Sequence, residues 1–386
     1  MDFTLTKTQQ DIKMAAREFA EREFPNIAEE CDEKEIFPRE VWKKACELGF
    51  IGSFIREEYG GPGLGLLEYA LIAEEFWRVD PGIGQALLST AFGAEIIQLH
   101  GTEDQKKKYL PPIVRGEKIM GLATTEPDAG SDITSARTTA VRKSDKYIIN
   151  GNKTMIGNGS IGDFLLVFCL TNPERPKVHD RFSFFIVETD RKGYEAIHMH
   201  GKMGLRAYDS ADVSLTDVEV PIDNLLGGVE GKGFYQAMDF FNMSRAWVGG
   251  FAVGAAQGAL ERAINHIKQR KQFGQPLSHF QFLRFKIAEM ATYVEAARNL
   301  VYKAAWSMDR GMKDYKLVAM AKWYAAELAV RVVDEALQLH GGYGYFADYG
   351  IEKFYRAIKA VEIYEGTKEI EKLIISNEIL GRIKRA

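Results

Sequence analysis

The sequence predicts an α+β protein with three parts, in the order helical, β, helical. Helical spacing of apolar residues gives way near residue 119 to β-branched and aromatic runs, and it returns beyond Gly231. We therefore expect an N-terminal α-helical domain over 1–118, a middle β domain of barrel or sandwich type over 119–228, and a C-terminal four-helix bundle over 229–386. A chain of 386 residues is long enough for these separate cores.

The N-terminal part carries helix start and stop signals throughout. Thr6 followed by Gln9 matches a capping box that opens a helix. Pro38 fits the first turn of a second helix, which Gly49 would end. Beyond a glycine-rich loop we expect helices near 66–79 and 82–99, and a further helix that starts at the capping box of Thr102 and Gln105.

The middle part is rich in strand-forming residues. The apolar runs 164–168 and 182–187 have the length and composition of strands. Asn150-Gly151 lies between two further runs of this kind, and the dipeptide is a strong signal for a two-residue turn. We therefore expect a hairpin at Asn150-Gly151.

The part beyond Gly231 has longer helical segments. Long helices joined by short loops favour an up-and-down bundle. The α–β–α order also favours a cleft between domains, and ligands commonly bind in such clefts. The expected helices lie near 233–270, 280–310, 313–340 and 352–380.

Composition argues against several classes of protein. A formal net charge of −4 provides no basic field for a nucleic-acid backbone. No apolar run approaches the roughly 20 residues that cross a bilayer, and the N-terminus lacks the apolar core of a signal peptide. The three cysteines have no CxxC spacing, which suits a reducing compartment, so we expect a cytoplasmic protein.

Metal binding is not expected from the sequence. Among seven histidines, His198 and His200 form the one short-range pair, and on a strand they would share a face. No other ligand is apparent near them along the chain.

The segment Thr124–Asp132 could bind a cofactor. Its hydroxyls, its glycine and its consecutive backbone N–H groups can hold phosphate oxygens or the carbonyls of a heterocycle. The same pattern fits an ordinary capped turn, and the segment alone does not decide between the two.

Two later segments have a similar character. Arg270 can bind a diphosphate through its forked guanidinium, and Phe273 can lie against an aromatic ring, although a helix end and a Gly-Gln-Pro turn also explain this stretch. The glycines in Gln338–Tyr345 let a backbone approach a ligand closely, although C-capping explains one or two of them. This second segment has no GxGxxG pattern and no preceding strand, so a Rossmann site is not expected.

Glu365 is a candidate general base. It is flanked by Ile363 and Tyr364 and followed by Gly366, a setting that could remove water from the carboxylate and raise its pKa. A solvated glutamate is the commoner interpretation of such a pattern, so the local sequence leaves both open.

In their order and spacing these segments resemble the acyl-CoA dehydrogenase family, over essentially the whole chain to Ile375. The resemblance implies an FAD enzyme that oxidises an acyl-CoA thioester to a 2,3-enoyl-CoA. A base would take a proton from C2 while a hydride leaves C3 for the flavin N5. The thioester carbonyl, bonded by the flavin ribityl chain and a backbone N–H, would stabilise the enolate-like charge. Electrons would pass to an electron-transferring flavoprotein.

The resemblance also implies roles for individual residues. Glu365 occupies the position of the base, because the alternative base position of some branched-chain members is Ser244 here, which is not a carboxylate. Asn242 and Arg245 fall where family members contact the CoA pantetheine and the active-site helix. The implied substrate contacts further include Gly366, Leu88 and Ala91.

The implied cofactor contacts come from distant parts of the chain. Some of them match contacts that family members make across a subunit interface, which implies a homotetramer, or at least a dimer. Thr125, Gly130 and Ser131 match flavin and diphosphate contacts; Arg270, Phe273, Gln281, Gln338, Gly341 and Gly342 match contacts across a subunit interface; Thr367 and Glu369 match the adenine end.

The chain departs from the family at positions 155 and 157. The family usually has Trp-Ile-Thr or Trp-Ile-Ser across 155–157, with the tryptophan beside the flavin and the hydroxyl bonded to N5. Met155 and Gly157 remove both groups and would vacate volume, unless a backbone N–H or a water compensates. We therefore hypothesise a bulky or alicyclic acyl group, such as a cyclohexane- or cyclohexene-carboxyl group. Ile83 replaces the arginine of glutaryl-CoA-oxidising relatives, which argues against a dicarboxylic substrate.

Two other functions remain open. An oxidase of the same fold would use dioxygen directly, and it would usually have an added C-terminal domain that 386 residues do not accommodate. A non-enzymatic acyl-CoA-binding protein would have little reason to keep Glu365, Arg270 and the 125–131 loop.

Overall fold

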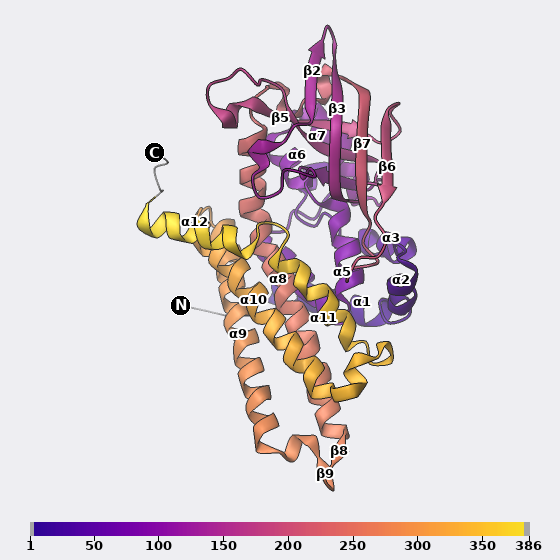
Figure 1. Ribbon diagram of the computed structural model, residues 1–386, viewed down its shortest axis with the longest axis vertical. Helices are drawn as coiled ribbons and strands as arrows, with labels where there is room; N and C mark the ends of the chain where they lie inside the picture. The colour runs from indigo at the N-terminus through magenta and orange to yellow at the C-terminus, as the bar shows by residue number, and fades with distance from the viewer. Residues whose placement is uncertain (1–3, 382–386) are drawn as a thin grey trace.

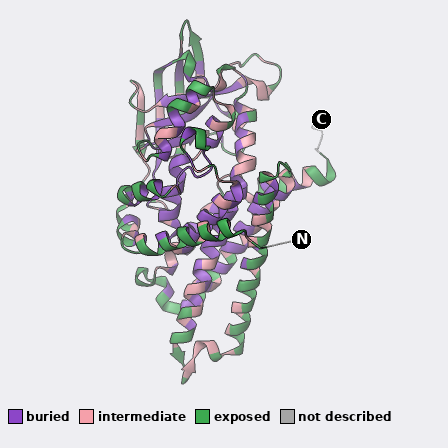
Figure 2. Cartoon of the chain, turned by 180° about the vertical axis from the view of Figure 1, so that it is seen from behind, coloured by how far each residue is buried: buried purple, intermediate pink, exposed green. Residues whose placement is uncertain are grey.

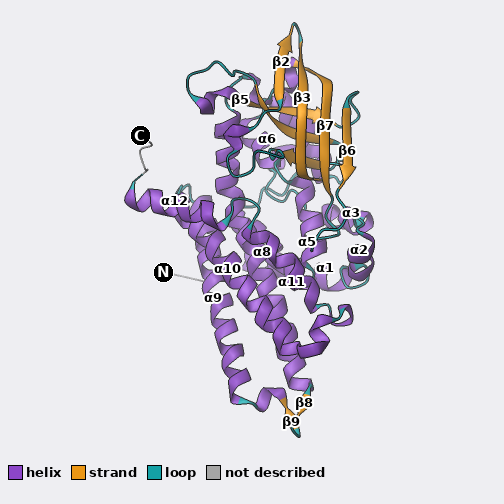
Figure 3. Ribbon diagram, in the orientation of Figure 1, coloured by secondary structure: helices purple, strands orange, loops and turns teal. Residues whose placement is uncertain are grey.

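The computed structural model describes residues 4–381 as an elongated molecule with a sheet at one end and long helices reaching the other (Figure 1). Apart from the short ribbon of β8 (Lys271–Gln272) and β9 (Gln275–Pro276), the strands lie together at the sheet end (Figure 3). The predicted α+β order of helical, β and helical parts is confirmed.

The N-terminal helices begin at the signals that the sequence carries. Thr6 and Gln9 form both bonds of a capping box at the start of α1, and Thr102 and Gln105 do so at α7. The segment 82–99 is not one helix, because Gly93, at φ +96°, turns the chain between α5 and α6. The helices are α1 (Lys7–Glu23), α2 (Ala28–Lys34), α3 (Arg39–Glu47), α4 (Leu66–Val79), α5 (Pro81–Leu88), α6 (Ala94–His100) and α7 (Glu103–Val114).

The middle part is a 7-stranded sheet in the order β1-β4-β2-β3-β7-β6, with β5 paired to β4. Most pairs are antiparallel, while β1 and β2 run parallel to β4. One face is closed by its own apolar cluster, which includes Tyr147, Phe185 and Val213. The strands are β1 (Met120–Ala123), β2 (Thr139–Lys143), β3 (Lys146–Gly157), β4 (Phe164–Leu170), β5 (Phe182–Glu188), β6 (Tyr194–His198) and β7 (Ser210–Pro221).

The hairpin predicted at Asn150-Gly151 is wrong. The turn between β2 and β3 lies at Ser144-Asp145, and β3 continues through Asn150-Gly151. Gly151 has a φ of +153°, and a side chain there would lie 2.4 Å from Thr138 Oγ1. The glycine therefore allows Thr138 to approach the backbone closely and forms part of a β-bulge within the strand. A pattern of residue types does not distinguish such a bulge from a turn.

Three long helices run side by side in the C-terminal part: α8 (Gly233–Gln269), α9 (Gln281–Asp309) and α10 (Tyr315–His340). The fourth predicted helix, 352–380, is broken into α11 (Ile351–Ile358) and α12 (Lys368–Leu380). Buried residues gather along the centre of the molecule, and exposed residues line much of α9 (Figure 2). Within residues 4–381, no helix combines the length and apolar character needed to cross a membrane.

Candidate active site

Glu365 lies on the turn that breaks the fourth C-terminal helix. Glu365 and Gly366 both have left-handed backbones, with φ of +56° and +96°. Gly366 is required there, because a side chain would begin 2.2 Å from Glu371 Oε1. Thr367 then caps α12 by accepting a hydrogen bond from the Ile370 N–H at 3.3 Å. A non-glycine residue in this conformation is strained, which is common where a side chain must be aimed.

The Glu365 carboxylate is held against α8. Ser244 Oγ donates to Glu365 Oε2 at 2.6 Å. Some surface of the side chain stays accessible, but the surrounding protein withdraws enough water to raise the pKa of Glu365 above its usual value, although the Ser244 hydroxyl, Arg245 and Lys322 oppose the rise. A carboxylate with a raised pKa and one fixed hydrogen bond is a suitable general base.

Buried charges support the turn from behind. Arg245 Nε donates to the Glu365 carbonyl at 3.2 Å and lies 2.8 Å from Glu371 Oε1. Lys322 donates to the Gly366 carbonyl. Burial raises the pKa of Glu371 to about 7 and lowers the pKa of Lys322 to about 8. Glu371 and Lys322 are fully buried charged residues. Their sequence pattern is that of ordinary helix positions, so it does not indicate this role.

The predicted substrate residues fall into two groups. Arg245 Nη1 donates to Asn242 Oδ1 at 3.2 Å, and Asn242, Arg245 and Gly366 lie around Glu365. Arg245 is buried and contacts the backbone of the Glu365 turn. Leu88 and Ala91 are fully buried at the end of α5 and in the 3₁₀ turn that follows.

Gly157 does not vacate the volume that we predicted. A side chain at Gly157 would begin 1.5 Å from Tyr208 Oη and 2.4 Å from Tyr208 Cζ, so the phenol of Tyr208 fills that space. Burial and the nearby charges of Asp209 and Glu365 raise the pKa of Tyr208, while Ser89 bonds to its hydroxyl. The sequence does not indicate this contact, because the proximity of Tyr208 to Gly157 arises from the tertiary fold.

Met155 is 63% exposed, with a left-handed backbone at φ +56°. It therefore presents its side chain outside the protein core, on the strand that also carries Gly157.

A second buried carboxyl group was also missed. Glu95 on α6 is 1% exposed, and its carboxylate accepts from the Gly93 N–H at 3.2 Å. Desolvation raises the pKa of Glu95 to about 8, helped by the charge of Glu365. Glu95 is therefore mainly protonated at neutral pH.

The Thr125–Ser131 loop is fixed by a buried ion pair. Glu126 accepts from the Arg137 N–H at 2.7 Å and the Thr138 N–H at 3.0 Å, and it meets Lys153 Nζ at 2.8 Å. Gly130 and Ser131 remain exposed, and apart from the adjacent residues no atom of the described residues lies within 4 Å of where a side chain on Gly130 would begin. The loop is thus rigid at its base and open at its tip.

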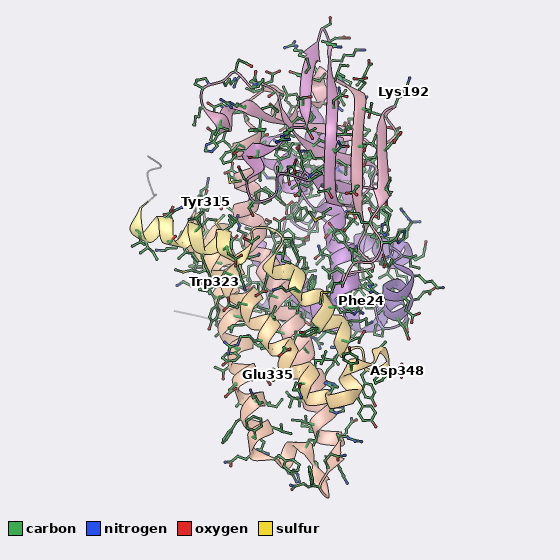
Figure 4. All side chains as sticks on the ribbon, viewed as in Figure 1. Phe24, Lys192, Tyr315, Trp323, Glu335 and Asp348 are labelled. Carbon is green, nitrogen blue, oxygen red and sulfur yellow. The ribbon has the colours of Figure 1, made fainter. Side chains whose placement is uncertain are left out.

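A second group of predicted cofactor residues lies at the far end of the bundle. A cavity of about 810 Å³ is lined there by Arg270, Gln338, Gly341 and Gly342, together with aromatic side chains. Figure 4 labels Glu335 and Asp348, two further lining residues, in the lower half of the helical part. Phe273 is 92% exposed at the tip of the β8–β9 ribbon, and Gln281 is exposed at the start of α9. The residues at this end of the bundle therefore lie far from the 125–131 loop within one chain (Figure 1). Thr367 and Glu369 are separate from them, at the start of α12 beside the Glu365 turn, and Glu369 is exposed.

Three family models match the chain: acyl-CoA dehydrogenase, N-terminal domain over 6–117, middle domain over 121–218 and C-terminal domain over 231–380. The chain belongs to the acyl-CoA dehydrogenase family. Acyl-CoA dehydrogenases depend on FAD, and the chain is accordingly an FAD-dependent oxidoreductase.

Individual acyl-CoA dehydrogenases are similar along nearly the full chain. The short-chain-specific acyl-CoA dehydrogenase of Clostridium acetobutylicum is 42% identical over 98% of this chain and 100% of its own. The cyclohex-1-ene-1-carbonyl-CoA dehydrogenase of Syntrophus aciditrophicus is 39% identical over 97% of this chain and 91% of its own. A glutaryl-CoA dehydrogenase from Mycobacterium smegmatis, solved with FADH2, has a TM-score of 0.93 at 28% identity, over 99% of this chain and 97% of its own. A further relative is the CarC subunit of the caffeyl-CoA reductase–Etf complex of Acetobacterium woodii, 40% identical over 96% of this chain and 98% of its own.

We expect Ser244→Ala to move the pH dependence of flavin reduction to higher pH. The Ser244 hydroxyl stabilises the charged form of Glu365, so its loss raises the pKa of the base. Because only the deprotonated base accepts a proton, the rate at a fixed neutral pH falls. Hydrogen bonds to charged groups contribute about 1.5–3 kcal/mol, which corresponds to a shift of about one pH unit or more. Stopped-flow reduction of the flavin by an acyl-CoA from pH 5 to 9 measures this shift. An unchanged pH profile would contradict the hydrogen bond from Ser244 to a catalytic Glu365.

Proposed function

We propose that the protein oxidises an acyl-CoA thioester to the enoyl-CoA, with Glu365 as the base that removes the C2 proton. The observation that carries the proposal is the Glu365 carboxylate, fixed by Ser244 at 2.6 Å and with its pKa raised by desolvation. Asn242 binds the CoA chain, while Arg245, Lys322 and Glu371 hold the Glu365–Gly366 turn. Leu88 and Ala91 contribute to the wall that receives the acyl group, and this wall excludes water from the base.

The residues present suit an FAD molecule. Bound FAD supplies the acceptor for the hydride that leaves C3. A guanidinium, two glycines and aromatic rings meet in the cavity at Arg270, which suits a diphosphate next to a planar ring. We propose that Thr125, Gly130 and Ser131 hold the flavin end with the backbone of Met155 and Gly157. At the far end of the bundle the proposed contacts are Arg270, Phe273, Gln281, Gln338, Gly341 and Gly342. At the start of α12 they are Thr367 and Glu369.

We further propose that the working enzyme is a homotetramer in the cytoplasm. The two groups of cofactor residues lie at distant places in one chain, so one FAD needs a second copy of the chain to reach both. The exposed aromatic residues Phe273, Phe282 and Phe346 mark the bundle end as a surface that a partner covers. The three cysteines are buried and unpaired, which suits a reducing compartment.

We propose an electron-transferring flavoprotein as the electron acceptor. The support is the relative named as a subunit of a caffeyl-CoA reductase–Etf complex, which is 40% identical to this chain. That relative is named a reductase. Assays with the flavoprotein partner should therefore measure both oxidation of the acyl-CoA and reduction of the enoyl-CoA. If the protein were instead an oxidase that uses dioxygen, its reduced flavin would be reoxidised quickly in air without this partner.

For the substrate we propose a bulky or alicyclic acyl group. Gly157 does not provide extra volume for such a group, because Tyr208 fills that space. What supports it is the exposed Met155 in place of a large tryptophan, and a relative named cyclohex-1-ene-1-carbonyl-CoA dehydrogenase at 39% identity.

Anaerobic reduction of the flavin by a panel of thioesters tests the substrate. We expect butyryl-CoA, isobutyryl-CoA and cyclohexane-carbonyl-CoA all to bleach the flavin, with the cyclic thioester fastest in kcat/KM. Faster reduction by butyryl-CoA would contradict the proposal of an alicyclic substrate but would still support the proposal of an acyl-CoA dehydrogenase. If no thioester bleached the flavin, the dehydrogenase itself would be rejected in favour of an acyl-CoA-binding protein.

A further inference from the structure

A cluster of metal-ligand side chains lies where the N-terminal helices meet the sheet, away from the Glu365 turn. Glu35 follows the end of α2, and His198 and His200 lie at and just beyond the end of β6. One ligand atom from each of the three side chains falls within 4.8 Å of the others. The sequence indicates only the histidine pair as possible ligands, because Glu35 lies more than 160 positions away from them along the chain.

The imidazole ring of His198 is held in the orientation that is typical of a metal ligand. Its Nδ1 lies 2.6 Å from Asp209 Oδ1, so the proton of a neutral ring is on Nδ1 and the Nε2 lone pair is free. Nε2 is buried and has no hydrogen-bond partner among the described residues. An imidazole bonded to a carboxylate through one nitrogen, with the other directed at a metal, is a recurrent arrangement in metal sites.

Nε2 faces a carboxylate across a gap. His198 Nε2 lies 3.8 Å from Glu35 Oε2, and His200 Nδ1 lies 3.4 Å from the same oxygen. The 3.8 Å distance is too long for a protonated ring to form a hydrogen bond. A lone pair and a carboxylate oxygen therefore face each other, which is favourable when a cation lies between them.

The Glu35 carboxylate is pre-positioned at this gap. The Gly201 N–H donates to Glu35 Oε1 at 3.0 Å and to Oε2 at 3.1 Å. The Glu35 side chain is 12% exposed, whereas His200 is 75% exposed and leaves an entry from solvent. Glu35 also has a left-handed φ of +54°, where a glycine or asparagine usually ends a helix.

The spacing suits a tetrahedral ion. Bonds of about 2.0–2.1 Å to zinc place neighbouring ligand atoms about 3.3 Å apart. The 3.4 Å separation already has this value, and the 3.8 Å separation needs a shift of about half an ångström, which a side-chain rotation supplies. Two imidazoles and one carboxylate are ligands that suit zinc and similar divalent transition metals better than magnesium.

We propose that Glu35, His198 and His200 form a binding site for a divalent transition metal such as Zn²⁺, with a water as the fourth ligand. The bound ion joins the end of α2 to the end of β6. It also fixes His198 against Asp209, which is adjacent to Tyr208, the residue whose hydroxyl packs on Gly157. The site is therefore a structural connection between the N-terminal helices and the segment that carries Tyr208.

Calorimetric titration of the chelator-treated holoenzyme with ZnCl2 tests the site. We expect saturable binding of one ion per chain, and no comparable binding of MgCl2. His200→Ala removes an exposed ligand without disturbing the core, and we expect it to weaken zinc binding at least about tenfold. Asp209→Asn leaves the ligands in place but alters their support, and we expect a weakening of about 10- to 100-fold.

The matched control is His279→Ala, which removes an exposed histidine outside the cluster. It should bind zinc as the wild type does, and zinc should raise the melting temperature of both proteins but not of His200→Ala. Absence of saturable zinc binding would overturn the site, and so would equal binding by His200→Ala. Flavin content and reduction by acyl-CoA are expected to stay unchanged in His200→Ala and His279→Ala, so the comparison of these two variants is independent of the proposed activity.

Discussion

Glu365→Gln is expected to slow flavin reduction by an acyl-CoA at least about a hundredfold, the usual magnitude for loss of a general base. Glutamine has the same shape, and its carbonyl oxygen can still accept from Ser244 Oγ, which now donates to Glu365 at 2.6 Å. The turn at φ +56° and the Arg245 bond to the backbone carbonyl need no charge on the side chain. What glutamine lacks is the ability to take a proton.

Stopped-flow bleaching measures the rate of flavin reduction, and equilibrium titration measures the binding of acyl-CoA, so together they separate loss of catalysis from loss of binding. We expect the variant to bind acyl-CoA within a few-fold of wild type while its reduction rate falls. Glu378→Gln removes one negative charge from the exposed face of α12, and it should behave as the wild type. Reduction of the Glu365→Gln flavin at the wild-type rate would show that another residue is the base.

Gly157→Ser is expected to destabilise the holoenzyme and to weaken flavin binding, although the family usually has serine or threonine at this position. The new side chain would begin 1.5 Å from Tyr208 Oη, so either the phenol or β3 must move. Overpacking of this kind typically costs about 1–3 kcal/mol. Chemical denaturation and titration of the apoprotein with FAD measure the two losses.

A second substitution at Tyr208 separates this steric explanation from a general effect of serine. Tyr208→Ala removes the ring, and we expect the double variant to recover stability, with a coupling energy of about 0.5–3 kcal/mol. Tyr208→Phe should not rescue, because the Cζ atom would still lie 2.4 Å from the new side chain. Additive effects of Gly157→Ser and Tyr208→Ala would mean that the two residues do not share the space.

Local signals predicted much of the fold. The capping boxes at Thr6 and Thr102 and the change to strand-forming residues near position 119 depend on neighbours in the sequence, and the structure confirms them. The hairpin at Asn150-Gly151 was wrong because Gly151 is needed for its approach to Thr138, a contact that local sequence does not encode. The helix expected over 352–380 fails where a strained turn directs Glu365 at Ser244.

The candidate site could be predicted only in part. The position of Glu365 came from a family resemblance, since its local sequence also fits a solvated residue. Tyr208, Glu371 and Lys322 could not be found, because their importance comes from contacts with residues distant in sequence. Glu35 joins His198 and His200 for the same reason. Such groups become visible when the tertiary structure places them together.

The most direct test of Glu365 as the base is exchange of the C2 hydrogens of acetyl-CoA with D2O, followed by NMR on the holoenzyme. Acetyl-CoA has no C3 hydrogen to lose, so exchange reports proton removal alone. We expect wild type and Glu378→Gln to exchange these hydrogens well above the solution background, and Glu365→Gln to exchange them at the background rate. Exchange by Glu365→Gln at the wild-type rate would contradict the assignment of the base.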